Sequence, residues 1–410
     1  MSAPSARALP LPGRLQGGLL HGLFFGLLML LAGCASPPAL APSPQGLLRD
    51  DLFGAVGPVP APQQVLAMTP AMVDYAEQEI TALARSKGLR QGMLDALYKR
   101  GQLQLEYDDS RTRNAAEAFE ARRGNCLSLV LMTAAFAKHL GLPVRFNSVF
   151  VEELWSRSGD LYLVAGHVNL SLGQPRLERS GARVFDVGEL LTIDFLPADQ
   201  LRRQRSRVIE EGTVLAMYYN NRAAESLREG QLEAAYGWAR AAVLSDPRFL
   251  AAQNTLGVIY RRAGHPALAE QVFRQLLQQE PANTQTLSNL VLVLEERGQA
   301  VEVQQLSARL RELQPEPPYK FYDQGIEAMR RGEFQEAKRL FTRELERAAY
   351  VHEFHFWLAL ANYGLGQMDE VRKHLALARE HSTTPMDRER YAAKLESLRR
   401  GSRAAERLPG

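Results

Sequence analysis

A glycine recurs every 34 residues through the second half of the chain, and this period constrains the fold more than any other feature. Three prolines each follow a glycine of the series by 17 residues. The two series are Gly230, Gly264, Gly298, Gly332 and Gly366, and Pro247, Pro281 and Pro315. Glycine permits a tight turn between two helices and proline ends a helix. The period therefore predicts stacked helix pairs whose core continues from one pair to the next.

Small and apolar residues recur at helical spacing around these glycines. They are Ala235, Ala239 and Ala242 in the first unit, Leu256, Gly257, Tyr260, Ala269, Phe273 and Leu276 in the second, and Ala337 and Phe341 in the fourth. A 34-residue helix–turn–helix unit of this pattern resembles the tetratricopeptide repeat. We expect five such repeats over residues 213–383, with a closing helix and tail over 384–410.

The resemblance implies a concave groove, lined by the first helix of each repeat, that binds a protein or peptide partner. Asn220, Asn221, Asn254 and Asn289 fall on this inner face by position. Carboxamides there can hydrogen-bond an extended peptide backbone, which makes these residues candidates for partner binding. The alternative is that they are ordinary solvated residues on a helix surface.

The first 33 residues have the features of an export signal. A basic start precedes an apolar run from Gly22 to Ala32, which is shorter than the roughly 20 residues that a membrane-spanning helix needs. The following tetrapeptide, Leu31-Ala32-Gly33-Cys34, resembles the lipobox of bacterial lipoproteins. That resemblance implies lipidation of Cys34 and, because Ala35 rather than aspartate follows, an anchor in the outer membrane facing the periplasm. A plain secretory signal or a short N-terminal anchor helix is the alternative.

Residues 34–69 are rich in proline and predict an extended tether. The apolar patch Leu47, Leu48, Leu52 and Phe53 interrupts this tether and is suited to docking on the folded part of the chain.

The segment 70–212 contains the candidate chemistry. Helices are expected over 70–87 and 90–100, and Gly124-Asn125-Cys126 precedes a long apolar helix that stops at Gly141. A thiol at a helix N-terminus is favoured as thiolate, and the free N–H groups there can receive an oxyanion.

Three strands are expected after this helix. They cover 144–151, 161–172 with His167, and 190–195 with Asp194. A helix followed by strands is the order in which a papain-like fold delivers its cysteine, base and orienting acid. His139, thirteen residues along the cysteine helix, is about 20 Å away and too distant to be the base.

Over roughly residues 110–200 the chain resembles the transglutaminase-like superfamily. The resemblance rests on the Gly124-x-Cys126 helix start, the Leu140-Gly-Leu-Pro-Val-Arg145 exit, the strand histidine and the later strand aspartate. It implies Cys126 as nucleophile, His167 as general base and Asp194 as the acid that orients the imidazole, with Asp186 as a second candidate for the acid. The expected fold class is an α+β papain/transglutaminase-like domain followed by an all-α tetratricopeptide-repeat solenoid.

Charge and motif content exclude several other functions. The chain carries 49 Lys and Arg against 46 Asp and Glu, and a net charge of +3 without a basic stripe argues against a nucleic-acid partner. No phosphate loop, paired-cysteine zinc site or nucleotide fingerprint is present, so we expect no cofactor and no bound metal. His352 and His355 share a helix face without an evident third ligand, and aromatic stacking among their neighbours is the favoured role.

These features predict a membrane-anchored exported lipoprotein of the cell envelope. Its cysteine domain would act on peptide or isopeptide amides through an acyl-thioester, and the repeats would recruit the substrate or partner protein. The main alternative is a catalytically inactive interaction scaffold, and a third possibility is a domain that merely braces the repeats. Hydrolysis, cross-linking and ligation all use the same triad, so the sequence leaves the acceptor open.

Overall fold

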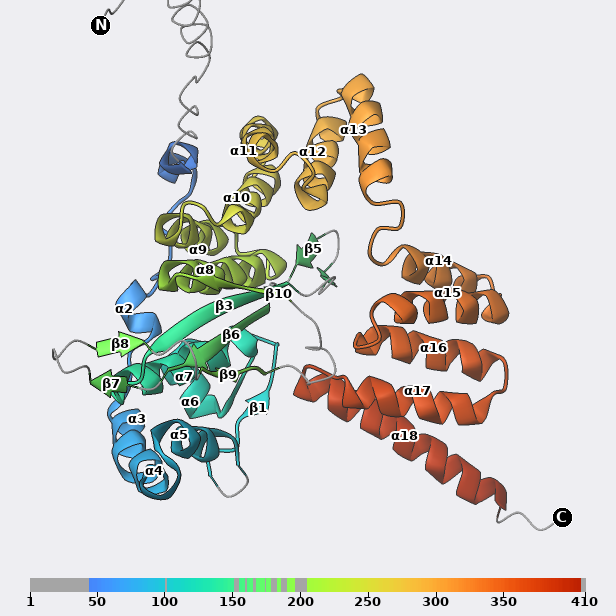
Figure 1. The fold of residues 1–410 in the computed structure, drawn as a ribbon. Helices are drawn as coiled ribbons and strands as arrows, with labels where there is room; N and C mark the ends of the chain where they lie inside the picture. The colour runs from blue at the N-terminus through green and yellow to red at the C-terminus, as the bar shows by residue number, and fades with distance from the viewer. Residues whose placement is uncertain are drawn as a thin grey trace, which may run out of the picture. The chain divides into compact units, whose positions relative to one another are not determined.

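The computed structural model describes residues 44–99, 102–150, 155–158, 161–164, 167–173, 175–177, 183–185, 190–195 and 205–406. The expected export signal, Cys34 and Asp186 lie outside these residues. Figure 1 presents an α+β domain followed by a run of paired helices. Within the described ranges, every helix is too short or too polar to cross a membrane.

Short helices precede the sheet. They are η1 (Pro44–Leu47), η2 (Asp50–Leu52), α2 (Pro62–Val65), α3 (Pro70–Tyr75), η3 (Ala76–Ile80), α4 (Thr81–Lys87), α5 (Leu89–Tyr98) and α6 (Ala115–Ala121). The helix predicted over 70–87 forms as α3, a π-helical turn at η3 and α4. Thr69 caps it, since the Thr69 hydroxyl accepts a hydrogen bond from the Met72 N–H at 3.3 Å. Gly88 ends the helix with a φ of 81°, a positive value that glycine adopts without steric cost.

The main sheet has four strands in the order β10-β3-β6-β9, and each neighbouring pair is antiparallel. The strands are β3 (Val144–Phe150), β6 (His167–Leu172), β9 (Leu191–Ile193) and β10 (Arg205–Ile209). A short parallel pair, β1 (Glu106–Tyr107) and β2 (Arg123–Gly124), and two hairpins accompany it. The hairpins join β4 (Trp155–Ser158) to β5 (Leu161–Val164) and β7 (Pro175–Leu177) to β8 (Arg183–Phe185).

Two features of the sheet differ from the sequence prediction. The single strand expected over 161–172 is two strands, because β5 pairs with β4 in a separate hairpin while β6 joins the main sheet. Strand β10 was not predicted. It lies at the edge of the sheet, and Val208, one of its two apolar residues, is 55% exposed, so the strand lacks the apolar alternation by which a half-buried strand is recognised.

Helix α7 (Cys126–His139) is the centre of the α+β domain. Every residue from Leu127 to Ala137 is buried. The apolar face of the sheet, with Phe146, Val168 and Leu170, belongs to the same hydrophobic cluster. A helix that is apolar all round is stable only when it is covered on all sides, which explains why so many elements converge on α7.

The second half of the described chain consists of helix pairs, and the prediction of five tetratricopeptide repeats is confirmed at the level of the fold. The pairs are α8 (Glu211–Arg228) and α9 (Leu232–Ser245), α10 (Leu250–Arg262) and α11 (Pro266–Gln279), α12 (Thr284–Glu296) and α13 (Ala300–Leu313), α14 (Lys320–Arg330) and α15 (Phe334–Arg347), and α16 (His352–Gly364) and α17 (Met368–Glu380). Helix α18 (Pro385–Glu406) closes the series. All five glycines of the 34-residue period have a φ between 70° and 81°, as their turns require.

The first repeat shares its core with the α+β domain. Val214, Tyr218 and Tyr219 of α8 are buried in the same hydrophobic cluster as α7 and the sheet. The expected boundary at residue 212 is therefore a change of secondary structure and not a break in packing.

The segment 47–60, here called the strap, packs on the first two repeats. The Tyr236 hydroxyl accepts a hydrogen bond from the Arg49 N–H at 2.9 Å and donates one to the Asp50 carboxylate at 2.7 Å. The Phe53 ring stacks on Tyr236 with centroids 4.0 Å apart, and Leu47 is buried in the core of these repeats. The apolar patch in the tether thus docks on the repeats, and the free tether is shorter than the 34–69 range predicted from composition.

Replacing Tyr236 by phenylalanine should loosen the strap. The ring stack remains, but two hydrogen bonds worth about 1 kcal/mol each are lost. We expect trypsin to cleave after Arg49 roughly 5- to 30-fold faster in Tyr236→Phe than in the unmodified chain, because cleavage follows the population of the open strap. Tyr363→Phe is the matched control, since Tyr363 is 61% exposed. Equal cleavage rates in both variants would contradict the assignment of the strap contacts.

A cluster of three histidines closes the fifth repeat. His355 is buried, its Nδ1 lies 3.1 Å from Nδ1 of His374, and its ring stacks against His381 at 5.5 Å. The Nε2–H of His355 donates to the carbonyl of Ala349 at 3.0 Å. His355 Nδ1 is therefore the bare nitrogen and accepts from His374, so a second proton on His355 would break this contact. The aromatic contacts predicted around His352 and His355 include the Phe356–Trp357 pair at 6.0 Å, whereas His352 contacts Tyr391 and His355 stacks on the other two histidines.

Acid should destabilise this repeat. Burial, with the neighbouring His374, His381 and Lys373, lowers the pKa of His355 to about 4. This pKa lies below the value of about 6.5 in the unfolded chain. The contribution of His355 to the free energy of unfolding is therefore fully present above pH 6.5 and is lost as the pH falls toward 4. We expect urea unfolding to give a free energy about 2 kcal/mol lower at pH 5 than at pH 7 from this residue. His355→Leu should remove that difference, and His139→Leu should retain it. An unchanged difference in His355→Leu would refute the assignment.

Candidate functional site

Cys126 is the first residue of α7, and the turn before it is fixed by side chains. Asn125 caps the helix. Its Oδ1 accepts from the N–H of Ser128 at 2.9 Å, and its Nδ2 donates to the Thr112 hydroxyl at 2.8 Å. Cys126 itself is partly exposed. The thiol therefore stands at the positive end of a buried helix, where N–H groups of the first turn are free of helical partners.

Gly124, two residues before the cysteine, has no space for a side chain. Gly124 is buried, and a Cβ atom added to it would lie 2.6 Å from the Cβ of Ser128. Gly124 also pairs with Tyr107 across β1 and β2. Burial raises the pKa of Tyr107 well above its ordinary value, and the neighbouring Cys126 raises it further. No sequence signal marks Tyr107, because its place beside the cysteine depends on a two-residue strand.

His167 is the first residue of β6 and is 1% exposed. Its Nε2 lies 2.6 Å from Oδ1 of Asp194. Burial lowers the pKa of His167, but the hydrogen bond with Asp194 and the nearby Cys126 outweigh it and raise the pKa to about 9, while Nδ1 has no hydrogen-bond partner among the described residues. Since Nε2 is engaged by Asp194, Nδ1 is the ring nitrogen left to exchange a proton with the thiol.

Asp194 directly follows β9 and reaches the histidine from the neighbouring strand. Its second oxygen, Oδ2, accepts a hydrogen bond from Nδ2 of Asn169 at 2.7 Å. The structure thus brings together the three residues singled out from the sequence, Cys126, His167 and Asp194. Their catalytic role stays a prediction. Asn169 stands two residues after the histidine, where the resembled superfamily often has an aromatic residue. Here it contacts Asp194.

The candidate partner-binding asparagines partly bind one another. Asn254 is buried, and its Oδ1 accepts from Nδ2 of Asn289 at 3.1 Å, which places both on facing sides of α10 and α12. Asn220 and Asn221 are partly exposed on α8. Asn254 and Asn289 thus contact each other and the Asn254 oxygen is already used within the protein, while partner binding by the four asparagines stays a prediction.

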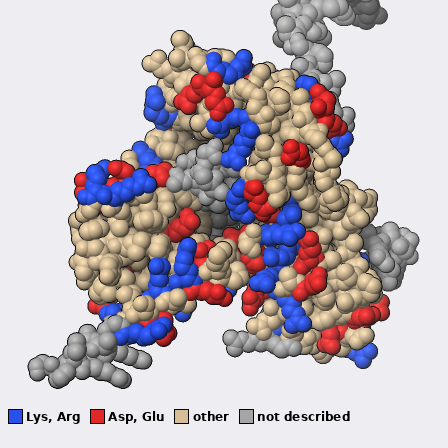
Figure 2. Space-filling model, turned by 180° about the vertical axis from the view of Figure 1, so that it is seen from behind, with Lys and Arg blue, Asp and Glu red and all other residues tan. Residues whose placement is uncertain are grey.

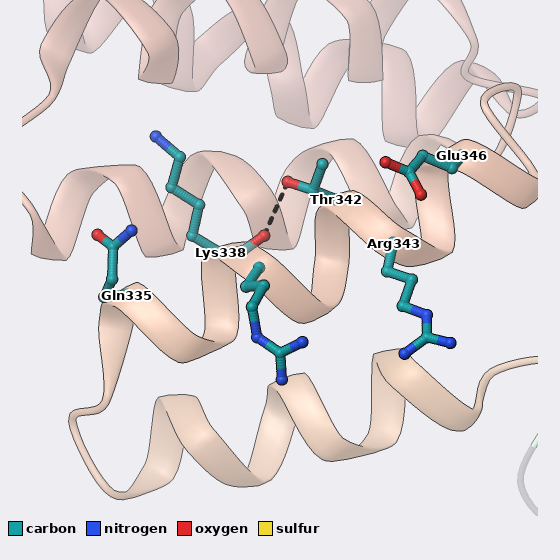
Figure 3. Close-up of a pocket in the computed structure, with 6 residues that line it drawn as sticks. Gln335, Lys338, Thr342, Arg343 and Glu346 are labelled. Atoms are coloured by element: carbon teal, nitrogen blue, oxygen red, sulfur yellow. Dashed lines mark hydrogen bonds between the residues drawn. The ribbon is translucent and has the colours of Figure 1, made fainter.

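A surface pocket lies elsewhere, along α15 (Figure 3). It measures about 380 Å³ and is lined by Gln335, Lys338, Arg339, Thr342, Arg343 and Glu346. Its cations already have partners. Lys338 donates to Gln367 at 2.6 Å, Arg339 pairs with Glu336 and Arg343 pairs with Glu316. This pocket is a solvated, internally paired helix face.

Charge and metal-ligand geometry give no further site. Lys and Arg alternate with Asp and Glu over the face drawn in Figure 2, in keeping with the near-neutral balance. Among the residues that the structure describes, no group of three or more His, Cys, Asp and Glu side chains is arranged to hold a metal ion.

No family model and no curated protein matches the chain. Solved structures that match include a thermophilic TPR protein of Thermus thermophilus, at 19% identity and a TM-score of 0.28, over 44% of this chain and 98% of that protein. PilF of Pseudomonas aeruginosa matches at 21% identity and 0.26, over 42% and 79%. YrrB, a TPR protein with an unusual peptide-binding site, matches at 19% identity and 0.24, over 42% and 89%. The repeat assignment itself rests on the 34-residue period and the helix pairs.

Removing the charge of Asp194 should lower the proton affinity of His167. In Asp194→Asn the burial of the ring remains, while the carboxylate that raises its pKa is lost, so we expect His167 to titrate below about 6.5 rather than near 9. Titration of ¹⁵N-labelled histidine by NMR measures this directly. Asp95→Asn, which removes a buried carboxylate in α5, should leave the His167 titration unchanged. Titration near 9 in Asp194→Asn would mean that the pair does not form.

Proposed function

We propose that the α+β domain is a transglutaminase-like cysteine enzyme that acts on peptide or isopeptide amides through an acyl-thioester. The observation that carries the proposal is the buried His167, whose Nε2 pairs with Asp194 at 2.6 Å and whose Nδ1 has no hydrogen-bond partner among the described residues, with Cys126 near the ring. A histidine held in this way retains its proton and stabilises a thiolate beside it.

The proposed reaction has two halves. The Cys126 thiolate attacks the amide carbonyl carbon, and the resulting oxyanion is received by N–H groups at the start of α7. The His167 imidazolium then gives its proton to the leaving amine as the C–N bond breaks, which leaves a thioester on Cys126. In the second half, neutral His167 takes a proton from water or from an amine as this acceptor attacks the thioester, the C–S bond breaks, and Cys126 leaves as the thiolate beside the imidazolium.

In this proposal the repeats recruit the partner protein and the N-terminus anchors the chain to a membrane. The tetratricopeptide repeats are a protein-interaction fold, and we assign to them the recruitment of the substrate or partner protein, with Asn221 and Asn289 as contacts of its backbone. Lipidation of Cys34 would hold the protein on a membrane of the cell envelope, with the outer membrane as the proposed site.

A second candidate function is an inactive scaffold. The observation in its favour is that His167 is only 1% exposed, so a substrate would meet the triad from the Cys126 side alone. In this case the α+β domain would support the repeats, and the repeats would organise an envelope complex.

Thiol reactivity separates the two candidates. With Cys34 replaced by serine, Cys126 is the only thiol in the chain. An enzyme of the proposed type should react with iodoacetamide at pH 7 about tenfold faster than a free model thiol, because a model thiol of pKa near 8.5 is only a few per cent thiolate at that pH. His167→Ala should abolish the excess.

The matched control is His139→Ala, since His139 lies on the same helix but at its opposite end. It should leave the reaction rate unchanged. Slow reaction of Cys126 in the unmodified site, or equal rates with and without His167, would favour the scaffold.

A further inference from the structure

One face of the sheet carries a row of polar side chains, most of which are buried and one of which, Thr192, is exposed. Alternation along an antiparallel strand puts residues two apart on the same face. The row consists of Asn147 on β3, His167, Asn169 and Ser171 on β6, Thr192 on β9 and Asp194 directly after it. Asn147, Asn169 and Ser171 are at most 7% exposed. Buried polar groups are costly unless they are hydrogen-bonded, so their bonds are part of what keeps this sheet stable.

The directions of the hydrogen bonds between Asp194, Asn169 and Asn147 are fixed by their neighbours. The carboxylate of Asp194 can only accept, so the atom of Asn169 that faces it at 2.7 Å is the amino group. The Asn169 oxygen then faces Asn147, whose amino group donates to it at 2.9 Å. The same amino group lies 3.0 Å from the Ser171 hydroxyl, which lies 2.9 Å from the hydroxyl of Thr192.

We propose that Asn169 is a positioning residue of the acyl-transfer site: it holds Oδ2 of Asp194 so that Oδ1 faces Nε2 of His167, and Asn147 in turn holds Asn169. The inference rests on the proposed function and extends it to a residue that makes no contact with the thiol.

The physical reason is the freedom of a carboxylate at a strand end. Asp194 follows the last residue of β9 and so lacks a strand residue on its C-terminal side to restrict it. A bond to one oxygen alone would let the group rotate about its Cα–Cβ and Cβ–Cγ bonds. Held at both oxygens, it presents a fixed acceptor to the imidazole. Hydrogen bonds to a carboxylate also favour its ionised form, which keeps the proton on the histidine.

Asn169→Ala, in the full chain with Cys34 replaced by serine, tests the proposal. We expect the His167 titration, followed by NMR of ¹⁵N-labelled histidine, to fall by about one pH unit from its value near 9. We expect alkylation of Cys126 by iodoacetamide at pH 7 to slow severalfold, because the thiolate loses part of its imidazolium partner.

Two variants separate positioning from plain support of the sheet. Ser171→Ala removes a polar contact from the same row without touching Asp194, so it should lower the unfolding temperature and leave the His167 titration in place. Asn147→Ala leaves the Asn169 donor on Asp194, so it should shift the titration by less than half as much as Asn169→Ala does. Equal titration shifts in Asn169→Ala and Ser171→Ala would overturn the proposal.

Further measurements guard against misfolding of Asn169→Ala and separate failure of this inference from failure of the proposed function. Asn169→Leu has nearly the size of asparagine and replaces Asn169→Ala if the latter does not unfold cooperatively. In the unmodified chain, the side-chain amide signals of Asn169 must move when His167 titrates, and their failure to move would also overturn the proposal. Failure of the proposed function has a different signature, since Cys126 would then lack excess reactivity in the unmodified site. If Cys126 shows the excess reactivity but Asn169→Ala changes neither its alkylation rate nor the His167 titration, only this inference is overturned.

Discussion

The burial of α7 on every side is the constraint on which the rest of the structure depends. A helix with eleven consecutive buried residues needs partners all around it, and the sheet, α6 and the first repeat provide them. The same burial fixes the position of its N-terminus, where Asn125 and Ser128 close the turn before Cys126. The apolar face of the sheet covers α7. His167 and Asp194 belong to the polar side chains that alternate with those apolar residues along the same strands. Packing and candidate chemistry thus depend on one set of contacts.

The repeats are predictable from the sequence because their signal is local and periodic. Glycine at a left-handed turn and small residues at helix contacts depend only on the helix pair itself, so Gly230 and Gly264 mark their turns without reference to the rest of the chain. The cysteine at a helix start was predictable for the same reason. Asn125 and the apolar run after it define the start of α7 within a few residues.

Other parts depend on contacts between distant segments and could not be predicted in this way. Strand β10 has an exposed valine, Val208, and takes its place in the sheet by pairing with β3. The hydrogen bond of Asn169 to Asp194 requires the register between β6 and β9, which no local signal in the sequence gives. The histidine cluster unites α16, α17 and the turn after α17, and His374 and His381 carried no signal of their own.

The fusion of α8 with the core of the α+β domain determines how the array of repeats comes apart. An open stack of repeats loses structure from its ends, because an end unit has a neighbour on one side only. Here the N-terminal end shares its core with a domain, while the other end is covered by α18, next to the acid-sensitive histidines, and the Asp109 N–H of the α+β domain donates to the Thr383 carbonyl just before α18 at 3.1 Å. We therefore expect fraying to begin at the C-terminal end, where this backbone hydrogen bond must first break, and to reach the unit attached to the cysteine helix last.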